Sequence, residues 1–268
     1  MPEHFSPASL SDSHRAELVQ AKQLLEHPGY VSRITDLIGM PLETAVRALP
    51  ASWKSKISDV TAASLNKCMQ VAHASLRGKA GSGVASPGLH RAAVALTGAA
   101  GGVFGIAGLA LELPVSTMVM LRSIADIGRA AGEQLDEPES QLACLMVFSL
   151  GGNSRADDAS ESGYYAARIA LSRAMTEATV YLSKHSVARE TAPAVVRLIA
   201  QIAARFNVQV SQKAAAMMVP IVGAAGGALV NTLFINHFQD MARGHFTVRR
   251  LERLYSPELV REAYRALP

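Results

Sequence analysis

The sequence predicts an all-α protein, a single multi-helix bundle built around a central hairpin rich in glycine and alanine. The 268-residue chain is 49% hydrophobic but only 5% aromatic and contains 20 Gly, so small side chains must supply much of its core. Helix-forming alanine is frequent, and no segment sustains the alternation of apolar and polar residues that is typical of strands. Two uncharged stretches, residues 92–111 and 214–235, are long enough to form central helices.

Composition and charge exclude several classes of protein. With 18% charged residues, the chain is too apolar to be disordered throughout. The formal net charge is only +4, and basic residues do not alternate with aromatic ones, so we expect no nucleic-acid partner. Cys68 and Cys144 lack the spacing of metal ligands and are expected to be buried, reduced thiols of a cytoplasmic protein.

One helical domain is expected after a short tail. We expect residues 1–10 to form a flexible N-terminal tail, without the features of a secretory signal, and residues 11–268 to form the domain. Ser11 or Ser13 is suited to cap the first helix, because a serine hydroxyl can accept a hydrogen bond from a free backbone N–H. Pro28-Gly29 is expected to end this helix.

Helical periodicity continues along the chain, interrupted by segments rich in Gly, Pro or polar residues. It predicts further helices over residues 31–38, 41–49, 51–76, 114–131, 138–150, 164–184 and 194–206, and two short helices within 247–267. The Gly-rich segment 78–88 is expected to be a flexible joint, and residues 153–162 a polar loop. Glu112-Leu113-Pro114 is expected to end the first uncharged stretch, so that Pro114 begins the next helix.

A glycine-rich element, Gly-Ala-Ala-Gly-Gly, occurs once in each uncharged stretch, at residues 98–102 and 223–227. Glycines four residues apart share a helix face, where the missing side chains let a second helix approach closely. The predicted helix-packing glycines are Gly98, Gly101, Gly102, Gly105, Gly223, Gly226 and Gly227. Each glycine costs a helix about 1 kcal/mol relative to alanine, so a compensating contact is expected.

Three interpretations of this repeat are open. We favour a tightly packed hairpin inside a soluble bundle, because Ala and Gly insert weakly into membranes. The second interpretation is reversible insertion into a membrane or its interface, and the third is a permanent span, since 20 residues reach across about 30 Å of hydrocarbon. Glu112, Pro220 and Asn231, in or beside the two stretches, argue against a permanent span.

Several short motifs, in their order and spacing, resemble the EcsC family over about residues 18–267. The motifs are IGMP at 38–41, GAAGG, LELP and LRSIADI within 98–127, GYYAAR at 163–168, VPIVGAAGG at 219–227 leading to Asn231, ARGHF at 242–246 and RLE at 250–252. The chain has Glu112-Leu113-Pro114 where the family usually has Asp-Leu-Pro, which is a mild change.

The resemblance implies a partner but no reaction. The family takes its name from the third gene of a bacterial operon that encodes an ABC transporter linked to secretion and competence. We therefore expect a non-enzymatic accessory protein that associates with a membrane surface or a membrane transporter. Its expected location is the cytoplasm, including the inner face of the cell membrane, and no cofactor is expected.

The alternative hypothesis is an enzyme or small-ligand-binding protein with a buried polar site beside the glycine-rich helices. Its candidate residues are Glu112, Arg122, Asp126, Asn231 and Asp240. Glu112 could meet Asn231 across a helical hairpin as a proton acceptor or polar anchor. We favour the simpler interpretation that Glu112 lies at a helix start, where the helix dipole stabilises a carboxylate. Arg122 and Asp126 are four residues apart and are expected to pair.

The remaining polar motifs carry weaker signals. His237, Asp240 and His245 form the best group of potential metal ligands, but Gly244 argues against one continuous helix, and we expect no metal. Tyr164, Tyr165 and Arg168 are expected to pack and to form a hydrogen bond. Six Arg against three Glu within residues 243–265 indicate a solvated helix face or, alternatively, a modest basic patch for an anionic membrane.

Overall fold

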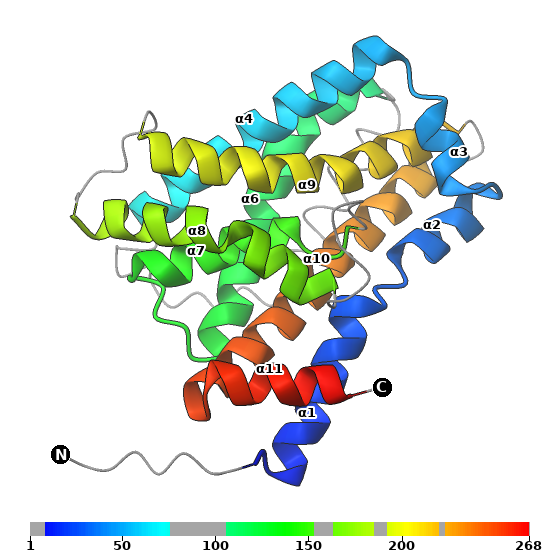
Figure 1. Ribbon diagram of the computed structural model, residues 1–268. Coiled ribbons are helices and arrows are strands. Elements are labelled where there is room, and N and C mark those ends of the chain that lie inside the picture. Colours follow the sequence, from blue (N-terminus) through cyan, green and yellow to red (C-terminus); the bar gives the residue numbers. More distant parts are fainter. Residues whose placement is uncertain (1–8, 76–105, 153–162, 185–191, 220–222, 268) are drawn as a thin grey trace.

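The computed structural model describes residues 9–75, 106–152, 163–184, 192–219 and 223–267. All regular secondary structure in these ranges is helical, which confirms the all-α fold (Figure 1). The elements are α1 (Asp12–Glu26), α2 (Tyr30–Ile38), α3 (Leu42–Arg47), α4 (Ala51–Ser75), α6 (Ile106–Ala130), α7 (Pro138–Met146), the 3-10 helix η1 (Val147–Ser149), α8 (Gly163–Lys184), α9 (Pro193–Met217), α10 (Gly223–Leu254) and α11 (Pro257–Ala266).

Several predicted features lie outside the described residues. These are most of the expected tail, the joint at 78–88, the polar loop at 153–162 and the repeat glycines Gly98, Gly101, Gly102 and Gly105. Gly223, Gly226 and Gly227 lie in the first two turns of α10, and their packing role stays a prediction. The first arm of the expected glycine hairpin is therefore not described.

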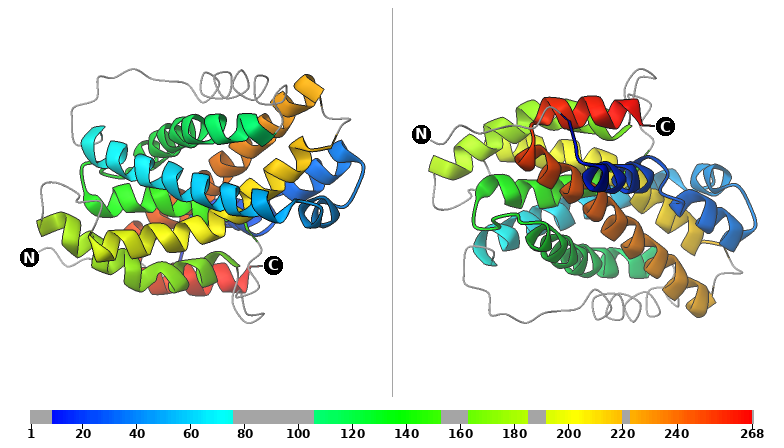
Figure 2. Two further views of the ribbon diagram at one scale, coloured as in Figure 1. Left: turned by 90° about the horizontal axis from the view of Figure 1, so that it is seen from above. Right: turned by 90° about the horizontal axis from the view of Figure 1, so that it is seen from below.

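Helices α6, α9 and α10 pack against one another in the middle of the molecule, α4 lies across α6 and α9 at the top of Figure 1, and α8 lies beside α9 (Figures 1 and 2). Four phenylalanines occupy the core between them, with ring centroids 4.9–6.1 Å apart: Phe148, Phe206, Phe234 and Phe238. Helix α10 runs from one end of the molecule, beside α2, α3 and the end of α9, to the other, beside α7, α8 and α11. Figure 1 shows these two ends at the right and at the lower left.

Helix α1, near the N-terminus, packs against the C-terminal helices α10 and α11. Its cap forms as predicted, with the Ser11 hydroxyl accepting from the backbone N–H of His14 at 3.3 Å. Helix α1 packs along α10, and a Cβ atom on Gly244 would lie 2.6 Å from Leu25 Cγ. Gly244 therefore does not end the helix but lets α1 approach the backbone of α10 closely.

The predicted helix start at Pro114 is wrong. Helix α6 begins at Ile106 and continues through Pro114, although proline inside a helix costs about 3 kcal/mol relative to alanine. Burial outweighs this local cost, because Leu113 is fully buried and α6 packs against α4, α9 and α10. The hydroxyl of Thr117 donates to the Leu113 carbonyl at 2.6 Å, so this polar group is satisfied inside the core.

The second uncharged stretch also differs from the prediction. Helix α9 extends past the expected end at residue 206 to Met217, and α10 starts at Gly223, so residues 214–235 belong to two helices. Residues 247–254, expected as a separate short helix, continue α10. In both cases a helix buried along its length continues through a boundary that the local sequence signals suggested.

Candidate functional site

One ion pair is buried where α6, α9 and α10 meet. Lys213 Nζ lies 2.7 Å from Glu112 Oε1 and 2.5 Å from Asn231 Oδ1, and 4.8 Å from the ring centroid of Phe234. The Lys213 side chain is 0% exposed and that of Glu112 is 3% exposed. Within the described ranges, Glu112 Oε2 has no hydrogen-bond partner. The pair is therefore enclosed in the apolar core, with one carboxylate oxygen unsatisfied.

Burial sets the electrostatics of this pair. It lowers the pKa of Lys213, and the charge and hydrogen bond of Glu112 oppose that decrease without cancelling it. Withdrawing two charges from water costs several kcal/mol for each ion, which is offset only while both partners stay in place. The interpretation of Glu112 as a helix-start carboxylate is wrong, because Glu112 is the seventh residue of α6. Chemically, the pair can act as an anchor that fixes the three helices.

The structure brings two of the five predicted polar-site residues together and separates the others. Glu112 and Asn231 share the Lys213 ammonium group. Along α6, Arg122 follows Glu112 by ten residues, or about 15 Å of helix, and Asp126 lies a further turn away. Asp126 forms its ion pair with Arg129 rather than with Arg122, at 2.8 Å. Asp240 pairs with Arg243 at 2.6 Å.

The three residues considered as metal ligands also occupy separate environments. The His237 ring lies 4.8 Å from that of Tyr30, Asp240 pairs with Arg243, and His245 contacts Tyr164. No group of three or more His, Cys, Asp or Glu side chains within the described ranges could hold a metal ion. Cys68 and Cys144 are buried free thiols, as predicted, and burial raises the pKa of each to about 12.

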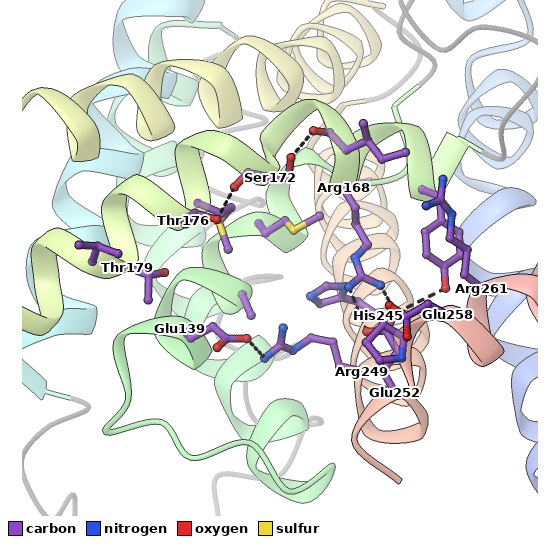
Figure 3. A pocket seen from close by; sticks show the side chains of 17 residues that line it. Glu139, Arg168, Ser172, Thr176, Thr179, His245, Arg249, Glu252, Glu258 and Arg261 are labelled. Atoms are coloured by element: carbon purple, nitrogen blue, oxygen red, sulfur yellow. Dashed lines mark hydrogen bonds and ion pairs between the residues drawn. The ribbon is translucent and has the colours of Figure 1, made fainter. Parts of the chain in front are cut away.

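A cavity of about 590 Å³ opens at the other end of α10, between α7, α8, α10 and α11 (Figure 3). We call it the His245 cavity. Its charged and titratable lining residues are Glu139, Tyr165, Arg168, His245, Arg249, Glu252, Glu258 and Arg261. In Figure 3 the imidazole of His245 projects into the cavity between Arg168 and Arg249. The cavity therefore combines a buried imidazole with several charged side chains.

A chain of hydrogen bonds orients His245. Arg168 donates to both carboxylate oxygens of Glu252, at 2.6 and 3.0 Å, and to the phenol oxygen of Tyr164 at 3.3 Å. The Tyr164 hydroxyl lies 2.9 Å from His245 Nδ1. Because its oxygen already accepts from Arg168, the phenol proton is free to be donated to Nδ1, which leaves the imidazole proton on Nε2.

His245 is neutral and has one unused polar atom. Burial, together with the positive charges of Arg249 and Arg168, lowers the pKa of His245 well below 6.5. Its Nε2 atom is buried and has no hydrogen-bond partner in the part of the chain that the structure describes. A buried donor without an acceptor is costly, so this atom is the natural place for a ligand oxygen to bind.

Helix α8 forms one wall of the cavity, and this wall carries apolar side chains with hydroxyl-bearing side chains between them. Ile169 and Val180, at its two ends, are each 48% exposed, which is unusual for large aliphatic side chains that line a cavity. Ser172, Thr176 and Thr179 lie between them, and Met146 and Met175 also line the cavity. The cavity therefore has a polar end on α10 and an apolar strip on α8.

Glu133 organises a neighbouring cluster of arginines. It accepts from Arg249 Nε at 2.9 Å, from the Ser140 hydroxyl at 2.7 Å, and from Arg253. Burial alone would raise the pKa of Glu133, but the hydrogen bonds and charge of Arg249, with Ser140 and Arg253, lower it to about 2. Arg249 also reaches Glu139 at 3.2 Å. Glu133 thus pairs with Arg249, which lines the His245 cavity, and with Arg253 beside it.

The opposite end of the molecule carries exposed apolar side chains. Met40 between α2 and α3, Met218 after α9, and Leu229 near the start of α10 are 37%, 41% and 45% exposed. We call the end formed by these segments the apolar end (Figure 1). None of the helices in the described ranges combines the length and apolar character needed to cross a membrane.

Sequence reasoning missed Lys213, Glu133 and the cavity position of His245. A signal for Lys213 was present: it is the only Asp, Glu, Lys or Arg within residues 206–239. Glu112 is likewise the only such residue within 92–121. A single acid and a single base, each isolated in a long apolar run, indicate a buried pair.

Comparison with known proteins places the chain in one family. The EcsC protein family model matches residues 16–251, which is most of the chain. No curated protein and no solved structure matches the sequence. Tyr164, Arg168, His245 and Glu252 all lie in motifs on which the family resemblance rests. The chain therefore belongs to the EcsC protein family.

Proposed function

We propose that this EcsC family protein is a non-enzymatic accessory protein that attaches peripherally to a membrane through its apolar end. The observation that carries the proposal is the exposure of Met40, Met218 and Leu229 on segments that the packing of α2, α3, α9 and α10 brings to the same end of the molecule. Exposed apolar surface of this kind typically marks a site of interaction with proteins or membranes. Met218 and Leu229 also belong to the uncharged stretch 214–235, so no charged side chain of that stretch opposes contact with lipid.

The residues at the start of α4 support a lipid surface as the direct contact. Residues 47–58 contain Arg47, Lys54 and Lys56 and no acidic residue, and all three basic side chains are exposed. The Lys56 ammonium group lies 5.5 Å from the ring of the half-buried Trp53. Tryptophan prefers the membrane interface, and each basic residue near an anionic surface contributes about 1 kcal/mol.

Membership of the EcsC family supports a membrane transporter as the biological context. The same apolar end would then lie at the inner face of the cell membrane, where such a transporter is found. Direct contact with lipid and contact with a transporter lead to different experimental results, because only lipid contact persists with pure vesicles.

Vesicle flotation tests the proposal. We expect the purified protein to float with vesicles of phosphatidylcholine and phosphatidylglycerol, and less with phosphatidylcholine alone. The double variant Met218→Glu, Leu229→Glu is expected to bind at least about tenfold more weakly, because it removes two apolar contacts and adds two negative charges. Val196→Glu is the matched control, since Val196 is 46% exposed and lies near the opposite end of α9.

The outcomes separate the parts of this proposal. Equal flotation of the double variant and the wild type would show that the apolar end is not the contact. Absence of flotation with both vesicle types would contradict lipid attachment, and co-purification with a membrane transporter would then be the test of the accessory role.

A second candidate function is the binding of a small ligand in the His245 cavity. The observation that favours it is the unpartnered Nε2 atom of His245 in a cavity of about 590 Å³. Cavities of about 300–1,000 Å³ with a few polar groups are typical of small-molecule sites. This function is ligand binding without catalysis. The described lining residues can hold a ligand through hydrogen bonds and apolar contacts.

A further inference from the structure

We propose that the His245 cavity binds a single-chain amphiphile with an uncharged, hydrogen-bond-accepting head group. This inference rests on the second proposed function, ligand binding in that cavity, and names the chemical class of the ligand. The head group accepts a hydrogen bond from His245 Nε2, and the hydrocarbon chain lies along α8. Three features of the cavity support this assignment: its donor, its apolar strip and its charge balance.

The donor selects a head group with an oxygen acceptor. His245 is neutral, and the hydrogen bond with Tyr164 leaves Nε2 as the protonated nitrogen, so Nε2 offers a single N–H to the cavity. Among the described residues this N–H has no partner, and an ester, ether or hydroxyl oxygen would satisfy it. The Arg168–Tyr164 hydrogen bond holds the phenol in the orientation that maintains this tautomer.

The apolar strip selects a hydrocarbon chain of limited length. Ile169 and Val180 are eleven residues apart on α8, which corresponds to about 16 Å of helix and to an extended chain of roughly a dozen carbon atoms. Both side chains are half exposed, so an overlying chain would remove much apolar surface from water. Met146 and Met175 contribute flexible side chains that adapt to an alkyl chain.

The charge balance selects an uncharged head. Apart from neutral His245, the described lining contains three arginines and three glutamates: Arg168, Arg249, Arg261, Glu139, Glu252 and Glu258. Arg168 is held by Glu252 through two hydrogen bonds, and Arg249 by Glu133 and Glu139. An anionic head at Arg168 or Arg249, or a cationic head at Glu252 or Glu139, would have to compete with these ion pairs, which is costly for half-buried charges. A neutral head uses the free donor without disturbing the pairs.

The test compares three probes with the same twelve-carbon chain. The probes are monolauroylglycerol, which is uncharged, dodecanoate, which is anionic, and dodecyltrimethylammonium, which is cationic. Titration calorimetry with full-length protein, below the micelle concentration of each probe, measures the affinities. We expect monolauroylglycerol to bind at least about tenfold more tightly than either charged probe.

Variants locate the bound probe. Val180→Glu changes an exposed residue of the strip and is expected to weaken monolauroylglycerol binding about tenfold or more, whereas Val196→Glu, equally exposed outside the cavity, is expected to leave it unchanged. His245→Phe removes the donor, and His245→Gln restores one. The loss with phenylalanine and its recovery with glutamine separate hydrogen bonding from packing. In wild-type protein labelled with ¹⁵N-histidine, the probe is expected to shift the Nε2 resonance of His245.

The outcomes distinguish the ligand class from ligand binding itself. Tighter binding of monolauroylglycerol that depends on Val180 and His245 supports the inference. Equal or tighter binding of a charged probe at the same residues would overturn the uncharged class but leave the cavity as a ligand site. If none of the three probes binds, both the inference and the second proposed function are overturned. The same follows if Val180→Glu and His245→Phe both leave probe binding unchanged.

Discussion

The two halves of α10 differ in how many charged side chains they carry and in how those charges are paired. Residues 223–239 contain no Asp, Glu, Lys or Arg and pack around the single Lys213–Glu112 pair supplied by α9 and α6. Residues 240–254 contain six such residues, in pairs that reach α1, α8 and the segment before α7. Beside the first half the buried cation has one carboxylate partner and is 0% exposed, whereas in the second half charges share partners and are partly exposed.

An excess of arginine in the sequence therefore need not produce a basic surface. Within residues 243–265, where a basic patch was one expectation, four arginines have carboxylate partners. The pairs are Arg243–Asp240, Arg249–Glu133, Arg250–Glu17 and Arg253–Glu133. Two of the carboxylate partners come from segments distant in the sequence, so the composition of the C-terminal region alone gave no measure of its exposed charge.

The largest expected effect comes from breaking the isolated pair. Lys213→Met is expected to lower the free energy of unfolding by about 3–5 kcal/mol, because it leaves the Glu112 carboxylate buried without its cation. Urea denaturation of the variant and the wild type measures the difference. A loss below about 1 kcal/mol would contradict the view that the pair is enclosed in the core.

The double variant Glu112→Leu, Lys213→Met is the matched control for that change. Removing both charges leaves an apolar contact, so its stability is expected to return to within about 1 kcal/mol of the wild type or to exceed it. A double variant as unstable as the single variant would show that packing, rather than charge, accounts for the loss.

An intermediate effect is expected for Glu133, whose charge is shared between two arginines. Its pKa is lowered from 4.5 to about 2 in the folded protein, so its contribution to stability is fully present above the unfolded pKa and is lost as the pH falls toward the folded one. We expect a loss of about 2–3 kcal/mol between roughly pH 5 and pH 2, measured by urea denaturation at each pH.

The variant Glu133→Gln isolates this contribution, because glutamine keeps the shape but cannot titrate. Its unfolding free energy is expected to be lower than that of the wild type at pH 7 and to fall less steeply in acid. An unchanged pH dependence would assign the acid sensitivity to other carboxylates.

The smallest effect is expected for the exposed pair Asp126–Arg129, whose side chains are 38% and 54% exposed. Asp126→Asn is expected to change the free energy of unfolding by less than about 0.5 kcal/mol, because water and salt already screen the charges. Thermal denaturation at low and high salt measures the change. A large effect would contradict the ranking by burial on which the comparison of the two halves of α10 rests.

Most helices could be predicted from the sequence because their signals are local. The cap at Ser11, the end of α2 at Gly39 and the start of α11 after Ser256 depend on residues a few positions apart. The failures at Pro114 and Gly244 have a common cause. At each of these positions a local helix-breaking residue is outweighed by packing against helices that come from distant parts of the chain. After residue 206 there is no Gly or Pro before Met217, and α9 continues to that residue.

The candidate sites could be predicted only in part, for the same reason. Glu112 and Asn231 were identified because a polar residue in an apolar run is conspicuous, and Lys213 had the same signal. By contrast, the meeting of His245 with Tyr164 joins residues 81 positions apart, and helix spacing carries no information on that contact. The family motifs contained both residues, but only the packing of α8 on α10 brings them together.

The attachment of α1 to the C-terminal region has a consequence for synthesis on the ribosome. The partners of α1 include Gly244, Tyr255, Tyr264 and Leu267, all more than 200 residues further along the chain. At about 5–20 residues per second, α1 leaves the ribosome roughly 10–50 s before these partners are made. During that interval its apolar face, including Leu18 and Leu25, lacks the surface that later buries it. The native docking of α1 can therefore take place only after α10 and α11 have been synthesised.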